Sequence, residues 1–186
     1  MATTDWTVRA ITRATLPLLL ALTLVEVGSG LVLGEFEAEL LRYPSLLVLV
    51  PVTIGTAGNL GSVLASRLST ALHLGLLSFD PRDSHLAGNA AALVALAASL
   101  FPLVGVGAWA LTALGGGTRL PLATVLLVAV SAGVALAVLA VAVTLVATYA
   151  AYRLELDPDD VVIPVVTNLC DVLGVLVLFG AVRAFV

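Results

Sequence analysis

Residues 121–152, PLATVLLVAVSAGVALAVLAVAVTLVATYAAY, contain no charged side chain and decide the class of fold. The hydrocarbon core of a bilayer is about 30 Å thick, and a helix needs about 20 apolar residues to cross it. The sequence contains four further stretches of sufficient length, at residues 7–33, 44–72, 86–114 and 161–186. We therefore expect an all-α polytopic membrane protein with five transmembrane helices.

The composition of the whole chain supports this expectation. Charged residues make up 11% of the 186 residues and hydrophobic residues 61%, whereas a soluble domain has about 25% charged residues. So few charges cannot cover the surface of a soluble protein, and a net charge of −4 is unfavourable for contact with a polyanion. The composition excludes a soluble globular protein, a disordered chain and a nucleic-acid-binding protein.

The connections between the five stretches are short and polar, so we expect residues 1–186 to form a single transmembrane domain without a cytoplasmic regulatory domain. An odd number of spans places the two termini on opposite sides of the membrane. The positive-inside rule favours a cytoplasmic N-terminus, because the inner side would then hold five arginines and the outer side three. These are Arg9, Arg13, Arg67, Arg82 and Arg153 against Arg42, Arg119 and Arg183. We expect an integral protein of the cell membrane.

Asp171 is the most deeply placed ionisable residue of the five stretches. It lies ten residues after Val161, which corresponds to about 15 Å along a helix. Pro164, Thr167 and Asn168 share its helical face, at spacings of seven, four and three residues. Ionisable side chains inside a membrane are costly and usually functional, so this face indicates an ion site. The alternative is a protonated Asp171 that only hydrogen-bonds a neighbouring helix.

The second stretch carries a face of small and polar residues. In PVTIGTAGNLGSVLASRLST, residues 51–70, one sector of about 100° holds Gly55, Gly58, Asn59, Ser62, Ser66 and Ser69. Ordinary close packing of helices also uses such residues. Together with Asp171, however, this face favours a pore or an ion site. We also expect the helix to be interrupted or distorted near Gly55–Asn59, because irregular backbone at membrane depth occurs where it lines a water-filled cavity. Glu26, in the first stretch, faces either the bundle or an ion path, and the sequence leaves both interpretations open.

These two regions resemble the signature helices of a known family. Residues 51–75, PVTIGTAGNLGSVLASRLSTALHLG, and residues 155–174, ELDPDDVVIPVVTNLCDVLG, are similar to helices of the MgtE magnesium channel family and of the related solute carrier family 41, with the closer likeness to the second. The matching positions are Pro51, Gly55, Gly58-Asn59, Gly61-Ser62 and residues 64–70 in the first region, and Asp157-Pro158-Asp159, Pro164, Thr167 and Asp171 in the second.

The resemblance implies a two-fold homodimer with ten helices and a cation path lined by the second and fifth spans. The transported ion would be Mg²⁺, or else Mn²⁺ or Ca²⁺. In this resemblance Asp171 matches the family's pore aspartate, and Gly58 and Asn59 match a Gly-Asn pair of the pore. Gly55 and Thr167 match positions that line the pore. Asn168 is not part of the family pattern, and we include it on helical spacing alone. Two Asp171 carboxylates across a dimer axis would set a charge of −2 against that of a divalent cation. Mg²⁺ dehydrates reluctantly, so we expect it to keep several waters.

Other functions stay open at this point. Asp171 could alternate between a divalent cation and Na⁺ or H⁺, which would make the protein a coupled exchanger. The polar faces could instead lock together a membrane subunit that transports nothing. We expect no enzyme activity, because the sequence shows no pairing of nucleophile and base and no metal triad. The single cysteine, Cys170, excludes a disulfide within the chain and a cysteine-based zinc site.

Overall fold

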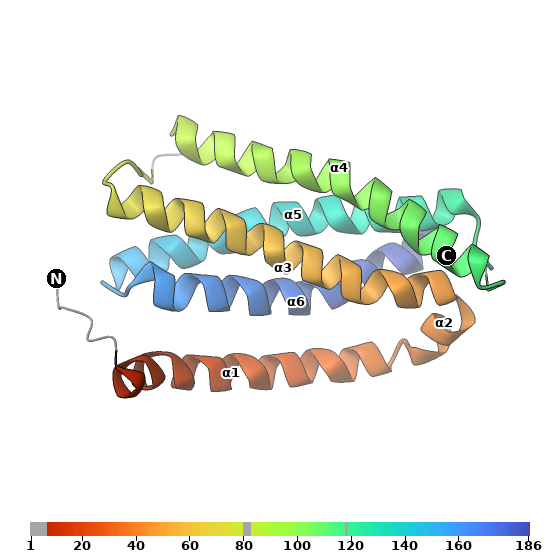
Figure 1. Cartoon of the computed structure of the whole chain (residues 1–186), viewed down its shortest axis with the longest axis horizontal. Coiled ribbons are helices and arrows are strands. Elements are labelled where there is room, and N and C mark those ends of the chain that lie inside the picture. The colour runs from red at the N-terminus through yellow and green to blue at the C-terminus, as the bar shows by residue number, and fades with distance from the viewer. Residues whose placement is uncertain (1–6, 80–82, 118) are drawn as a thin grey trace.

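The structure, a computed structural model, describes residues 7–79, 83–117 and 119–186. Within these ranges the chain forms six helices and no strand (Figure 1): α1 Val8–Gly34, α2 Glu37–Arg42, α3 Pro44–His73, α4 Ser84–Leu114, α5 Leu122–Arg153 and α6 Pro158–Phe185. Five of the helices, all except α2, are long and apolar enough to cross a membrane. The expectation of an all-α membrane protein with five spanning helices is therefore confirmed.

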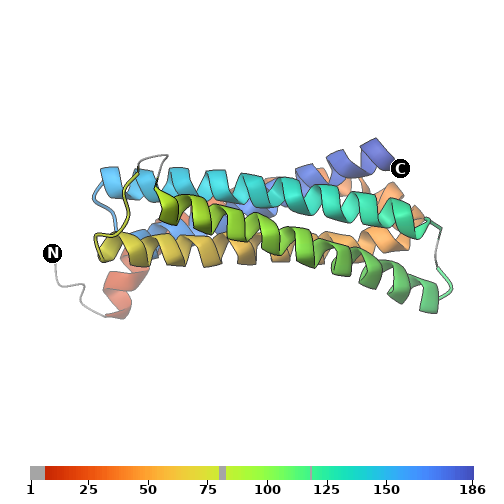
Figure 2. The same ribbon diagram turned by 90° about the horizontal axis from the view of Figure 1, so that it is seen from above.

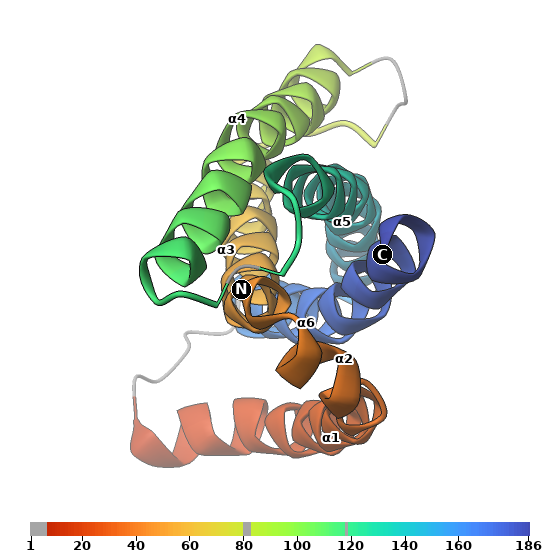
Figure 3. The same cartoon turned by 90° about the vertical axis from the view of Figure 1, so that its right-hand side faces the viewer.

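The five long helices lie roughly along one axis and alternate in direction (Figures 1 and 2). α1, α4 and α6 run one way, and α3 and α5 run the other way, so α1 begins and α6 ends at opposite ends of the bundle. α6 packs against α5, α3 and α1, while α4 covers α3 and α5. An end-on view shows α1 at the edge of the bundle (Figure 3).

The core lies around α3 and α5. In each of these helices 44% of the apolar membrane-spanning window is buried, against 6% in α1. Small side chains in α5 let its neighbours approach closely, as is common between membrane helices. The fully buried ring of Phe101 in α4 occupies the space beside Gly133 of α5, where an added Cβ would lie 2.0 Å from the ring. The exposed apolar outer surface is typical of a chain that meets lipid.

Side-chain caps begin three of the described helices, and at the start of α1 the hydroxyl oxygen of Thr7 accepts a hydrogen bond from the N–H of Ala10. Asp157 accepts a hydrogen bond from the backbone N–H of Asp159, and Pro158 occupies the first turn, so α6 begins where the sequence places a cap. Asp83 accepts hydrogen bonds from the N–H groups of His85 and Leu86 at the start of α4. The hydroxyl and N–H of Ser78, with the N–H of His85, lower the pKa of the Asp83 carboxyl to about 2. This carboxylate is therefore ionised at neutral pH.

The structure corrects two details of the expected fold. Residues 34–43 are expected as a polar connection, but they contain the short helix α2, whose Leu40 is buried. The ring of Phe36 stacks on Phe179 of α6 with 3.7 Å between centroids, and this tertiary contact orders a segment too short for a periodic signal. Of the interruption or distortion expected near Gly55–Asn59, the interruption is wrong, because α3 is one continuous helix. Packing against α5 and α6 outweighs the cost of helical glycine, which is about 1 kcal/mol per residue.

The contact between Gly133 and Phe101 yields a test of the packing. Gly133→Ala should lower the thermal unfolding temperature in detergent or nanodiscs, because overpacking of a buried site costs about 1–3 kcal/mol. Gly107→Ala, in α4, is the matched control: its Cβ meets nothing within 4 Å, so only the gain in helix propensity remains. An unfolding temperature of Gly133→Ala equal to that of the control would contradict the packing described here.

Candidate functional site

The centre of the candidate site is a close contact between Gly58 of α3 and Asp171 of α6. Both residues lie midway along their helices, so they meet at the middle of the bundle. A Cβ added to Gly58 would lie 3.3 Å from Oδ1 of Asp171 and 3.9 Å from the backbone oxygen of Thr167. Any larger residue than glycine would press on the carboxylate. Gly58 therefore lets a carboxylate group lie directly against the backbone of the neighbouring helix.

One face of α3 beside this contact is uncovered, and it carries small and polar residues together with the exposed valines Val52 and Val63. Gly55, Asn59 and Ser66 are exposed and Ser62 is half-buried, whereas the other side of α3 is buried against α5 and α6. The exposed residues follow the helical spacing expected for one face. A membrane helix normally turns polar side chains away from lipid. The polar residues make this face the part of α3 that is least suited to contact with lipid.

Thr167 and Asn168 of α6 lie within about one turn of Asp171, and the structure shows how their side chains are held. The hydroxyl of Thr167 donates to the backbone oxygens of Ile163 and Pro164, at 3.0 Å each. The Nδ2 of Asn168 donates to the oxygen of Pro164 at 3.0 Å, which leaves its Oδ1 available to a ligand. The ring of Pro164 provides no N–H, so the carbonyl oxygen of Asp160 also lacks its usual helical donor.

Of the six residues expected at the site, the structure brings Gly58, Asp171 and Thr167 together at one contact. Asn168 and Asn59 stand next to this contact on α6 and α3, and Gly55 lies one turn away on the exposed face of α3. Cys170 is buried, and its Sγ packs 3.3 Å from where a Cβ on Gly61 would be, so it belongs to the core between α3 and α6.

The structure also places Glu26 of α1, whose role the sequence leaves open. Glu26 is half-buried on the side of α1 that packs against α6, the helix that carries Asp171. Sequence analysis cannot find this proximity, because it depends on how α1 docks against α6. The only sequence signal is the presence of a lone carboxylate within an apolar span.

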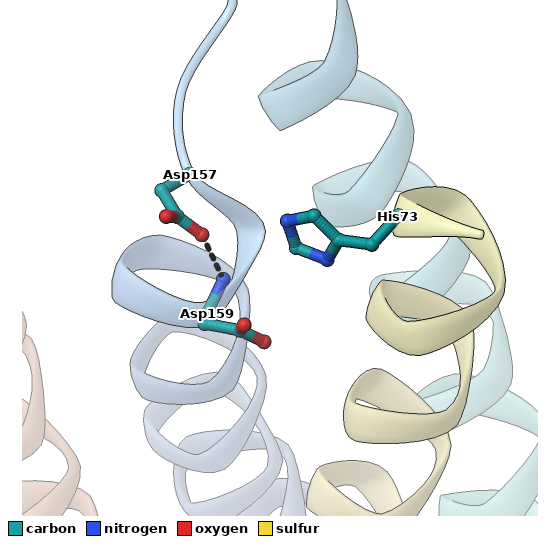
Figure 4. Close-up of side chains that lie close together, drawn as sticks. All are labelled: His73, Asp157 and Asp159. Atoms are coloured by element: carbon teal, nitrogen blue, oxygen red, sulfur yellow. Dashed lines mark hydrogen bonds between the residues drawn. The ribbon is translucent and has the colours of Figure 1, made fainter. Parts of the chain in front are cut away.

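A second group of possible ligands lies at one end of the bundle, where α3 ends and α6 begins (Figure 4). One ligand atom each of His73, Asp157 and Asp159 lies within 4.8 Å of the others, and all three residues are exposed. Ser69 joins them, because its hydroxyl donates to Asp159 at 2.6 Å and its backbone oxygen lies 3.0 Å from Nδ1 of His73. An imidazole and two carboxylates can hold a metal ion. The sequence predicts the cap at Asp157 but not the approach of His73, which is distant along the chain.

A bundle of apolar helices with a carboxylate at mid-depth is typical of α-helical membrane proteins that move ions. Residues 50–181 match the MgtE family, whose description is divalent cation transporter. Because the match covers most of the chain, the protein belongs to this family, as the resemblance of its second and fifth spans indicates. Both regions of that resemblance, residues 51–75 and 155–174, lie inside the matched residues.

The contact at Gly58 leads to a prediction about transport. Gly58→Ala should reduce the uptake of Mg²⁺ into proteoliposomes, because the new methyl group displaces the Asp171 carboxylate by a few tenths of an ångström. The fold should survive, since a Cβ contact of 3.3 Å is tight but not prohibitive. Gly88→Ala, an exposed position of α4 with nothing within 4 Å, is the control. Wild-type uptake by Gly58→Ala would show that the position of the carboxylate is unimportant.

Proposed function

We propose that this protein transports Mg²⁺, or the related ions Mn²⁺ and Ca²⁺, across the cell membrane. The path runs along the interface of a two-fold homodimer and is lined by α3 and α6, with Asp171 as the central ligand. The observation that carries this proposal is the uncovered polar face of α3 next to the mid-depth carboxylate of Asp171. Membership of a divalent cation transporter family supports the class of substrate.

The same face supports a dimer. Lipid cannot solvate the exposed amide of Asn59, and each unsatisfied polar group costs several kcal/mol there. A second copy of the chain related by a two-fold axis would cover this face with an identical one and enclose a polar path. Two Asp171 carboxylates would then face a cation of charge +2. Without a counter-ion, charges at this depth are unfavourable.

The available donor atoms suit a hard cation. Carboxylate and amide oxygens come from Asp171, Asn59 and Asn168, and backbone oxygens near Pro164 add to them. Mg²⁺ prefers six oxygen ligands and keeps several of its waters, so a few protein oxygens suffice to hold a hydrated ion. Softer metals prefer sulfur or imidazole, and Cys170 is buried away from the polar face.

The proposed topology places the N-terminus in the cytoplasm. α1 begins and α6 ends at opposite ends of the bundle, as five spans require. The distribution of arginines supports this orientation by the positive-inside rule. The end of α3 and the start of α6, with His73, Asp157 and Asp159, would then lie on the cytoplasmic side.

Substitutions of Asp171 distinguish a cation ligand from a structural hydrogen bond. Asp171→Asn keeps the shape but removes the charge, so Mg²⁺ binding should weaken by roughly 3 kcal/mol or more, about a hundredfold. Asp171→Glu should keep partial activity, because the charge remains but its position changes. A structural role predicts the opposite order, with Asn the better replacement. Calorimetry and uptake in liposomes measure both variants, and near-normal uptake by Asp171→Asn would overturn the assignment.

Crosslinking tests the dimer. Single cysteines along residues 165–174, and one at Asn59, on a Cys170→Ala background should give disulfide-linked dimers with a helical periodicity. Val138 on α5, an exposed apolar position in the groove between α4 and α5, is the control site and should give no crosslink. If a folded sample gives no dimer at any of the α6 or α3 positions, the path lies elsewhere.

A further inference from the structure

α1 contacts the rest of the protein along one narrow seam. Its less exposed positions include Leu18, Leu22, Glu26, Ser29 and Leu33, which repeat every three or four residues and therefore form one helical face. This seam packs against α6. Glu26 is its only charged member and lies near the middle of the span Thr15–Gly34. The carboxyl group of Glu26 is thus turned toward the bundle.

Asp171 lies between this seam and α3. On one side its Oδ1 approaches Gly58, and on the other side α6 packs against the face of α1 that carries Glu26. Half-buried carboxyl groups from two adjacent helices therefore lie near the middle of the bundle. Two like charges at such a place repel strongly, because the low dielectric of the surroundings screens them poorly.

Among the residues that the structure describes, no basic side chain lies at this depth to neutralise the pair. The described basic residues are all arginines near a helix end or in a connection: Arg9, Arg13, Arg42, Arg67, Arg119, Arg153 and Arg183. Arg67 is the nearest to a mid-span position, and its Nε donates to Oδ1 of Asn89 at 2.5 Å on the exposed side of α3. A cation from solution is the remaining source of positive charge.

We propose that Glu26 is a second carboxylate ligand of the transported divalent cation and acts with Asp171 of the same protomer. This inference rests on the proposed role of Asp171. Each protomer then supplies a charge of −2 to one hydrated Mg²⁺, from α1 and α6, and the partner subunit is not needed for the first binding step. α1 thereby becomes part of the cation site as well as a membrane anchor.

The test compares Glu26→Gln, Asp171→Asn and the double variant, as full chains in nanodiscs, with Mg²⁺ and Mn²⁺ as the probes. Calorimetry gives the affinity, and the rise of the unfolding temperature with added Mg²⁺ gives an independent measure of binding. Glu39→Gln removes an exposed carboxylate of α2 and is the matched control for net charge. Glu26→Asp, which keeps the charge, tests for partial rescue.

We expect Glu26→Gln to weaken Mg²⁺ binding tenfold or more and to reduce the stabilisation by Mg²⁺, while Glu39→Gln binds as the wild type does. Since both carboxylates would hold the same ion, the loss in the double variant should be smaller than the product of the two single losses. Wild-type affinity in Glu26→Gln, with weak binding in Asp171→Asn, would overturn this inference alone. Wild-type affinity in Asp171→Asn would overturn the proposed function.

Discussion

The close approach of α3 and α6 at Gly58 is the contact on which the rest of the site depends. A glycine midway along a buried helix leaves room for the carboxyl group of Asp171 against the α3 backbone. Gly61, one turn later, repeats the arrangement, because its Cβ would lie 2.6 Å from Cγ1 of Val166. Small residues therefore set the distance between the two helices, and this distance positions the carboxylate at mid-depth.

The helices around that contact differ in how much of their surface is buried, and this difference bears on where an ion path could lie. α3 and α5 are packed on most sides, while the polar face of α3 is uncovered and α1 touches the bundle only along its seam. A membrane chain with these features needs further polar partners, for which a second copy and a hydrated cation are the simplest candidates. Asp171 and Glu26 lie at the border between the packed and the uncovered parts.

The sequence allows most of the fold and part of the site to be predicted. The five spans follow from the long apolar stretches, and the start of α6 follows from Asp157 and Pro158. Asp171 and the residues around Gly58 stand out because polar groups are rare in apolar helices. The expected break in α3 was wrong, since helix propensity is local whereas packing against α5 and α6 keeps the helix continuous. α2 was missed because the contact between Phe36 and Phe179 orders it.

The sequence by itself determined that the chain spans the membrane five times, because the length and apolarity of each stretch depend only on local residues. It also determined which polar residues lie at mid-depth, since position along a helix follows from counting residues. Only the tertiary structure decided which of them meet. The packing of the α1 face that carries Glu26 against α6, and the approach of His73 to Asp157 and Asp159, depend on how helices distant in the sequence pack, and the periodicity of a single helix carries no information about its neighbours.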